Sequence, residues 1–122
     1  MKRVAVLGLL LAVGGLSIGV AAMQPSGIKV PDIYKIKDNL YIIGGSQPEI
    51  KGEFSGGNTA IWVTDKGVVV VDQKNPGWGS TILDKIKTVT NKPVIMALNS
   101  HGHSDHAGSI TELPASVEIV VH

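Results

Sequence analysis

The side chains best suited to chemistry gather near the C-terminal end of the chain, in the stretch SHGHSDH. Three of the protein's four histidines and an aspartate fall within six consecutive positions, as His101, His103, Asp105 and His106. In an extended segment His101 and His103 point to the same side, and Gly102 leaves the backbone room to bend. Asp105 and His106 follow where the chain must turn, so they can face a neighbouring ion. Imidazole and carboxylate ligands suit zinc, and also iron or manganese.

Two other interpretations of this stretch are a polar loop that merely contains histidines, and buried histidines paired with backbone groups. Metal binding is favoured because the stretch holds three of only four histidines. The chain has no cysteine, so nitrogen and oxygen atoms are the ligands to expect.

Two strands and a helix are predicted to position the cluster. The apolar runs at residues 68–72 (VVVVD) and 94–98 (VIMAL) have the length of strands, and residues 80–90 have the spacing of an amphipathic helix. This order predicts a right-handed βαβ unit with parallel strands, and the continuous valines predict a strand covered on both faces. The histidines then follow the end of a strand, at the sheet edge where open α/β folds bind ligands.

The remaining apolar patterns predict further elements. Glycines and a proline predict a long loop over residues 44–57, and Trp62 alternates within a strand that should place it in the core. The other predicted elements are a hairpin of strands 33–36 and 40–43, a strand 58–64, a short helix within 108–113 and a buried strand 117–121.

The first residues have the order of a secretory signal peptide. Lys2 and Arg3 precede an uncharged apolar run, and Ala21 and Ala22 provide small residues for cleavage. A transmembrane anchor is the alternative, but four glycines interrupt a run that is already short for a membrane span. We therefore expect a signal peptide at residues 1–22, a domain at residues 23–122, and export to the periplasm or the medium. Membrane attachment is expected only through an uncleaved signal segment.

Composition sets limits on size and partners. The 122 residues, with 43% hydrophobic and 17% charged residues, are typical of one folded domain or less. The net charge of +1 includes Lys2 and Arg3 of the leader, so no basic patch suggests nucleic-acid binding. A small-molecule substrate is the expected partner.

The stretch from His101 to His106 matches the HxHxDH motif of the metallo-β-lactamase superfamily, and the order strand, Asp72, helix, buried strand and motif agrees with that family over residues 33–122. The resemblance implies an αββα sandwich, here incomplete, with His101 and His103 on a first zinc ion and Asp105 and His106 on a second. It also implies that Asp72 lies behind the ligands near the metal site, although a lone aspartate here can equally open a loop.

The resemblance also implies a reaction. Zinc lowers the pKa of bound water to about 7, so the expected enzyme is a hydrolase of lactam, lactone, thioester or ester bonds. Asp105 is the expected general acid/base as well as a ligand. An iron-dependent oxidoreductase similar to the persulfide dioxygenases and a non-catalytic truncated fragment are the alternatives.

The resemblance implies that the other ligands come from the second half of the fold, which we expect to be missing from this sequence, and His122 is not expected to replace them. The 122-residue chain alone is therefore expected to be inactive. Two weaker candidates for substrate contact are Phe54, in the position of the family's flap loop, and Trp78, at the mouth of the pocket. An ordinary surface loop and packing within the domain are their alternatives.

Overall fold

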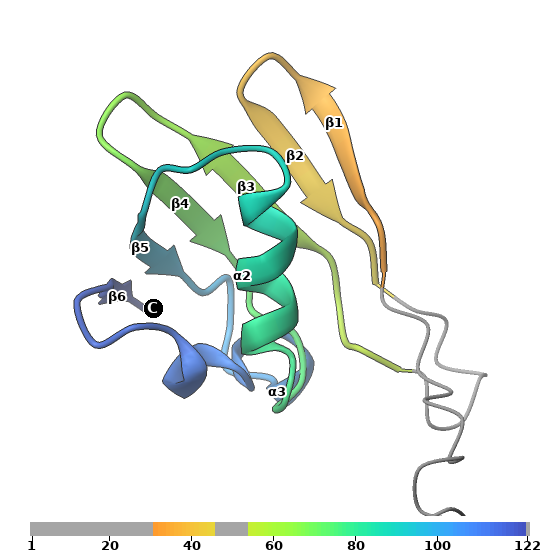
Figure 1. The fold of residues 1–122 in the computed structure, drawn as a ribbon. Coiled ribbons are helices and arrows are strands. Elements are labelled where there is room, and N and C mark those ends of the chain that lie inside the picture. The colour runs from red at the N-terminus through yellow and green to blue at the C-terminus, as the bar shows by residue number, and fades with distance from the viewer. Residues whose placement is uncertain (1–30, 46–53, 122) are drawn as a thin grey trace, which may run out of the picture.

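The structure is a computed structural model that describes residues 31–45 and 54–121. Its strands form one six-stranded sheet in the order β1-β2-β3-β4-β5-β6, and helix α2 lies across one face of it (Figure 1). The strands are β1 (Ile33–Lys37), β2 (Leu40–Ile43), β3 (Thr59–Val63), β4 (Val68–Val71), β5 (Val94–Leu98) and β6 (Glu118–Val120). The helices are α2 (Gly79–Lys87), α3 (Ser104–Ala107) and the short 3-10 helix η1 (Ile110–Glu112).

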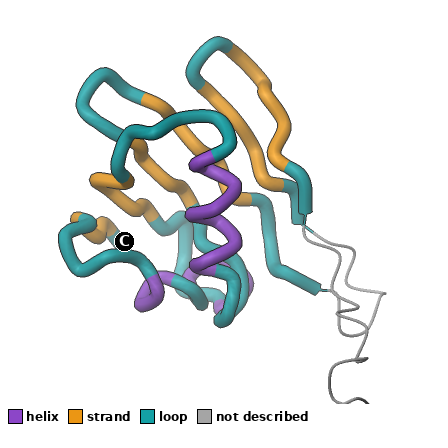
Figure 2. Tube along the Cα trace, viewed as in Figure 1, coloured by secondary structure: helices purple, strands orange, loops and turns teal. Residues whose placement is uncertain are grey.

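The strand directions divide the sheet into two parts. Strands β1 to β4 pair antiparallel, whereas β4 with β5 and β5 with β6 pair parallel. Helix α2 connects β4 to β5, and Figure 2 shows it lying in front of the sheet. The predicted strand, helix, strand unit with parallel strands is therefore confirmed. Because β4 and β5 run in the same direction, their carboxyl ends meet at one edge of the sheet, where α3 begins.

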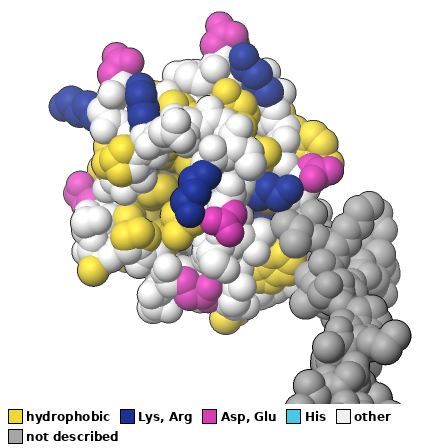
Figure 3. Space-filling model, in the orientation of Figure 1, with side chains coloured by type: hydrophobic (Ala, Val, Ile, Leu, Met, Phe, Trp, Pro, Cys, Tyr) yellow, Lys and Arg dark blue, Asp and Glu magenta, His cyan; other side chains and the backbone are white. Residues whose placement is uncertain are grey.

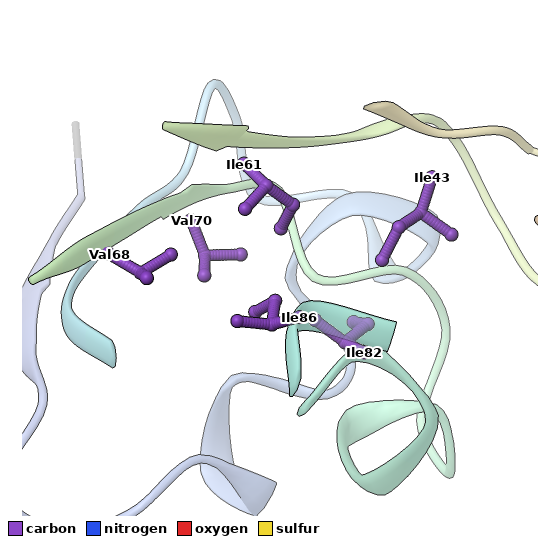
Figure 4. Close-up of a cluster of buried hydrophobic side chains, with 6 residues drawn as sticks. All are labelled: Ile43, Ile61, Val68, Val70, Ile82 and Ile86. Carbon is purple, nitrogen blue, oxygen red and sulfur yellow. The ribbon is translucent and has the colours of Figure 1, made fainter. Parts of the chain in front are cut away.

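The core lies between the sheet and α2. Four side chains from three strands meet two from the helix: Ile43, Ile61, Val68, Val70, Ile82 and Ile86 (Figure 4). Alternate residues of a strand point to opposite faces, so Val68 and Val70 face α2 while Val69 points away. All three valines are buried, as the continuous apolar run predicts. Helix α2 covers one face of the strand, and cover on the opposite face stays a prediction.

Helix α2 confirms the predicted amphipathic pattern with different ends. It stops at Lys87 rather than at residue 90, because the N–H groups of Thr88 and Val89 bond to carbonyls only three residues back. At its start, the Glu112 carboxylate accepts hydrogen bonds from the N–H groups of Gly77 and Gly79. The bond from Gly79 satisfies a helix donor that has no partner within the helix, and both bonds fix η1 against α2.

The last predicted strand is present but is not buried. Val117 packs with Ala97 and Leu113 in a second small cluster, whereas Ile119 and Val120 in β6 are 44% and 41% exposed. The prediction of a buried strand over 117–121 is wrong because β6 is the edge strand of the sheet, so β5 covers only one side of it.

Trp62 also differs from its prediction. It is 51% exposed rather than part of the core. In the β3–β4 register Trp62 is paired with Val69, and alternation turns both side chains to the sheet face opposite α2. The alternating pattern predicts the strand, but it does not tell which of the two faces is covered.

Several predictions fall outside the described residues. They concern the signal peptide at 1–22, the middle of the loop at 46–53, and His122. Within the part of the chain that the structure describes, no helix has the length and apolar character needed to cross a membrane.

On the face that α2 covers, Lys side chains and acidic side chains are interspersed around hydrophobic ones (Figure 3).

Candidate metal centre

The candidate residues meet at the carboxyl ends of two parallel strands. Asp72 directly follows β4, and Ser100 stands two residues after β5. The backbone N–H of Asp72 bonds to the Leu98 carbonyl at 2.9 Å, which holds the two strand ends together. From here the chain passes through His101 and His103 into α3, whose first turn carries Asp105 and His106.

Asp72 is the hydrogen-bond centre of this edge. Its carboxylate accepts bonds from the Ser100 N–H at 2.8 Å, the Ser100 hydroxyl at 2.8 Å and His106 Nδ1 at 2.7 Å. The residue is only 8% exposed, and its φ of 60° lies in the left-handed region. Asp72 thus lies against His106, and its role behind metal ligands stays a prediction.

The pKa of Asp72 is lowered from its ordinary value. Burial alone would raise the pKa of this carboxyl group, but the hydrogen bond from the Ser100 N–H opposes it, with those from His106 and the Ser100 hydroxyl. Together these bonds outweigh the burial, so Asp72 is a carboxylate at neutral pH.

A carboxylate beside His106 decides which ring nitrogen carries the proton. Because a carboxylate can only accept, His106 Nδ1–H donates to Asp72, and in the neutral imidazole Nε2 then keeps its lone pair. This is the arrangement in which a histidine ligates a metal through Nε2 while a carboxylate orients the ring. His106 Nε2 lies 3.5 Å from Asp105 Oδ2.

Ser100 extends the same network to His101. The Ser100 hydroxyl has one proton, which it donates to Asp72, so its oxygen accepts from His101 Nδ1 at 2.9 Å. This leaves His101 Nε2 with a free lone pair as well. Asp72 therefore orients His106 directly and His101 through Ser100. Sequence reasoning missed Ser100, although a hydroxyl next to the first histidine was an available signal.

The imidazole rings lie close together. The centroid of the His101 ring is 4.7 Å from that of His103 and 4.2 Å from that of His106. His101 and His103 are exposed, whereas Asp105 and His106 are half-buried. The structure thus brings together the four residues predicted to be ligands at one open edge of the sheet.

The donors fit part of a zinc site. Zinc bonds of about 2.0 to 2.2 Å at a tetrahedral angle place two donors about 3.4 Å apart. The 3.5 Å between Asp105 Oδ2 and His106 Nε2 is close to this separation, so both can reach one ion. Within residues 31–45 and 54–121, no group of three or more His, Cys, Asp or Glu side chains could hold a metal ion.

The two candidates for substrate contact lie at different places. Phe54 is 38% exposed, and its carbonyl accepts a bond from Asn75 Nδ2 at 3.2 Å. Trp78 is partly buried and packs against the core cluster, and its backbone N–H donates to Ser109 Oγ at 2.9 Å. Their roles in substrate binding stay predictions.

Comparison with known proteins agrees with this arrangement. Residues 53–122 match the family model described as the metallo-beta-lactamase superfamily. A metallo-beta-lactamase type 2 from Elizabethkingia meningoseptica is 34% identical over 101 residues, which are 78% of this chain and 39% of that relative. The chain therefore spans about two fifths of the length of this relative.

Solved structures show the same fold. The crystal structure of the metallo-beta-lactamase IND-7 is 30% identical with a TM-score of 0.56, over 70% of this chain and 39% of that one. A metallo-beta-lactamase from Pontibacter korlensis is 21% identical with a TM-score of 0.58, over 75% of this chain and 43% of that one, and shows the fold alone. The predicted fold class, an incomplete αββα sandwich, is confirmed. By its family match over more than half of its residues, the chain belongs to the metallo-beta-lactamase superfamily.

Proposed function

We propose that this chain supplies the N-terminal part of the active site of a zinc-dependent hydrolase. In this proposal His101 and His103 bind one zinc ion, and Asp105 and His106 bind a second. The observation that carries it is the Asp72–His106 hydrogen bond of 2.7 Å. This bond leaves the lone pair of His106 Nε2, beside Asp105 Oδ2, for a metal ion. A histidine that only filled a polar loop would not need a buried carboxylate behind it.

The protein's own residues have distinct roles in this site. A zinc ion held by these residues would lower the pKa of a bound water molecule to about 7, so that hydroxide would be available at neutral pH. Asp105 combines a ligand oxygen with a half-buried carboxylate at the open edge, where it can take a proton from the attacking water and return it to the leaving group. Asp72 and Ser100 hold the imidazoles in one tautomer throughout.

The substrate class follows from this chemistry and from the relatives. A nucleophile made from water attacks a polarised carbonyl group, so lactams, lactones, thioesters and other esters are the bonds to test. The identified relatives are named metallo-beta-lactamases, which makes lactams the first substrate to assay. Because the chain spans 39% of the first relative, the proposal concerns these residues within the complete family domain.

Zinc titration and hydrolysis assays test the proposal. A version that spans the whole domain should bind zinc stoichiometrically and hydrolyse nitrocefin, a lactone or a thioester, and His101→Ala, His103→Ala or Asp105→Ala should abolish turnover. Asp84→Ala is a matched control, because this carboxylate is exposed on α2 and pairs with Lys87. Activity that is indifferent to the first three substitutions would refute the metal mechanism. Metal analysis that finds iron together with oxygen consumption would support the oxidoreductase instead.

A further inference from the structure

Lys74 is a buried lysine that the proposed reaction does not use. It is 0% exposed and is the largest of the fully buried side chains in the described residues. A fully buried lysine is rare unless its ammonium group is paired, because removing the charge from water is costly. The position therefore needs an explanation in terms of what the ammonium group contacts.

The ammonium group joins two segments that are distant along the chain. Lys74 Nζ donates hydrogen bonds to the carbonyl oxygens of Gly44 and Gly57, both at 2.8 Å, and lies 3.5 Å from Ser55 Oγ. Gly44 directly follows β2, and Gly57 stands two residues before β3. A further hydrogen bond of 2.8 Å, from the Gly45 N–H to Asn58 Oδ1, joins the same two segments. Lys74 thus fastens both ends of the connection between β2 and β3.

One of these ends touches the metal-binding segment. The Gly57 N–H bonds to the Asp105 carbonyl at 2.9 Å. A Cβ atom added at Gly57 would lie 2.6 Å from His106 Cε1, so the glycine backbone rests directly on this imidazole ring. From the other side, the Lys74 carbonyl accepts a bond from the Gly108 N–H at 2.8 Å, just after α3. Lys74 therefore holds Gly57 through its side chain and the end of α3 through its backbone.

The hydrogen bonds from Lys74 require its ammonium group, and not only a side chain of similar length. Two carbonyl oxygens converge on Nζ, and an apolar side chain here would leave both without this donor. Burial lowers the pKa of Lys74 to about 8, so the ammonium form is still the major one at pH 7. A methionine would fill a similar volume and would remove only the hydrogen bonds and the charge.

We propose that Lys74 is a positioning residue, whose ammonium group clamps the two ends of the β2–β3 connection and thereby holds Gly57 against His106 and Asp105. The named ligands rest on the proposed function, whereas the clamp itself does not. If Lys74 served only global stability, replacing it would lower the free energy of unfolding and leave the geometry at His106 as it was. The clamp instead predicts a local effect at Gly57 and at the site.

Hydrogen exchange in the metal-free protein tests the clamp without any ligand. In Lys74→Met, exchange of the Gly57 N–H should become at least tenfold faster relative to core amides such as that of Val70. Lys92→Met is the matched control, since Lys92 Nζ also donates to a backbone carbonyl, that of Thr64 at 2.8 Å, but does so at an exposed position away from the site. Unchanged exchange at Gly57 in folded Lys74→Met would overturn the proposal.

Zinc affinity tests whether Lys74 also influences the proposed ligands. It is measured on the version that spans the whole domain, by competition with a chromogenic chelator. Lys74→Met should weaken zinc about tenfold, the lower end of what is usual for residues behind metal ligands. Gly57→Ala should do the same by pressing on His106, and it decides the matter if Lys74→Met does not fold. Gly67→Ala is its control, because a Cβ atom there is equally close, 2.6 Å from Ile95 Cγ2, but at the other end of β4.

The outcomes separate the two proposals. Faster exchange at Gly57 in a protein that binds no zinc would leave the clamp standing and refute the proposed function. Tight zinc binding that neither Lys74→Met nor Gly57→Ala weakens would overturn the positioning role and leave the proposed function intact.

Discussion

Replacing Asp72 by asparagine tests the network behind the histidines most directly. The amide has nearly the same shape as the carboxylate, and its oxygen can still accept from the Ser100 N–H. Its NH2 group, however, takes the place of the oxygen that accepts from His106 Nδ1 and from the Ser100 hydroxyl. Ser100 can rotate its hydroxyl and accept from the amide, but His106 Nδ1–H would meet another donor at 2.7 Å.

His106 has two responses, and both are unfavourable. If the ring keeps its proton on Nδ1, a hydrogen bond to a charged group is lost, which costs about 1.5 to 3 kcal/mol of stability. If the proton moves to Nε2, the lone pair that would bind metal is occupied. We therefore expect Asp72→Asn to lower the free energy of unfolding by about 2 kcal/mol and to weaken zinc binding by about 10- to 100-fold.

Urea unfolding and zinc competition measure the two effects, with Asp84→Asn as the control because Asp84 is exposed on α2. The pH dependence provides a further check. The pKa of Asp72 is lower in the folded protein than its ordinary value of 3.8, so its stabilising effect is present above that pH and is lost as the pH falls through the folded value. The stability difference from Asp72→Asn should therefore shrink below pH 4. A change of less than twofold in zinc affinity would refute the orientation of His106 by Asp72.

Three further outcomes are expected. Ser100→Ala should weaken zinc binding by about tenfold or less, because it removes the link from Asp72 to His101 while the direct bond from His106 to Asp72 remains. A larger loss of zinc affinity than that of Asp72→Asn in the same titration would contradict this expectation. We expect the chain to be exported and to begin near Met23 after cleavage at Ala22, and an intact Met1 on membrane-bound material in mass spectrometry would contradict the signal peptide. The 122-residue chain should self-associate through its exposed apolar face, where Trp62 is 51% exposed, and a monodisperse monomer with a sharp cooperative melt in sedimentation and calorimetry would contradict this.

Much of this fold could be predicted because its signals are local. The valines of β4 and the apolar spacing of α2 each indicate their element within a few residues of sequence, and the HxHxDH stretch indicates the family in the same way. Burial was less predictable, as Trp62 and β6 show, because it depends on which elements cover each face of the sheet. A period-two pattern identifies a strand but does not count the layers around it.

The network behind the histidines was hidden for a different reason. His106 and Asp72 are 34 residues apart, and the Lys74 ammonium bonds to residues 30 and 17 positions away. No periodicity links such positions, and a lysine after a strand is ordinarily taken as an exposed charge. Only the parallel pairing of β4 with β5, which brings the strand ends together, makes Ser100 a neighbour of Asp72.

The backbone directly after β4 explains how one short segment holds both the histidine cluster, through Asp72, and the ends of the β2–β3 connection, through Lys74. Asp72 and Lys74 each have a φ of 60°, a left-handed conformation that costs about 1 to 2 kcal/mol for a residue with a Cβ atom. Each is held there by hydrogen bonds to a charged side chain, worth about 1.5 to 3 kcal/mol apiece: three to the Asp72 carboxylate and two short ones from the Lys74 ammonium group. Because residues in sparsely populated conformations persist only where their surroundings determine them, the two charges and the turn depend on one another. Removing either charge should therefore relax the turn and disturb the partner's contacts, so the effects of Asp72→Asn and Lys74→Met on zinc affinity should be non-additive in a double-mutant cycle.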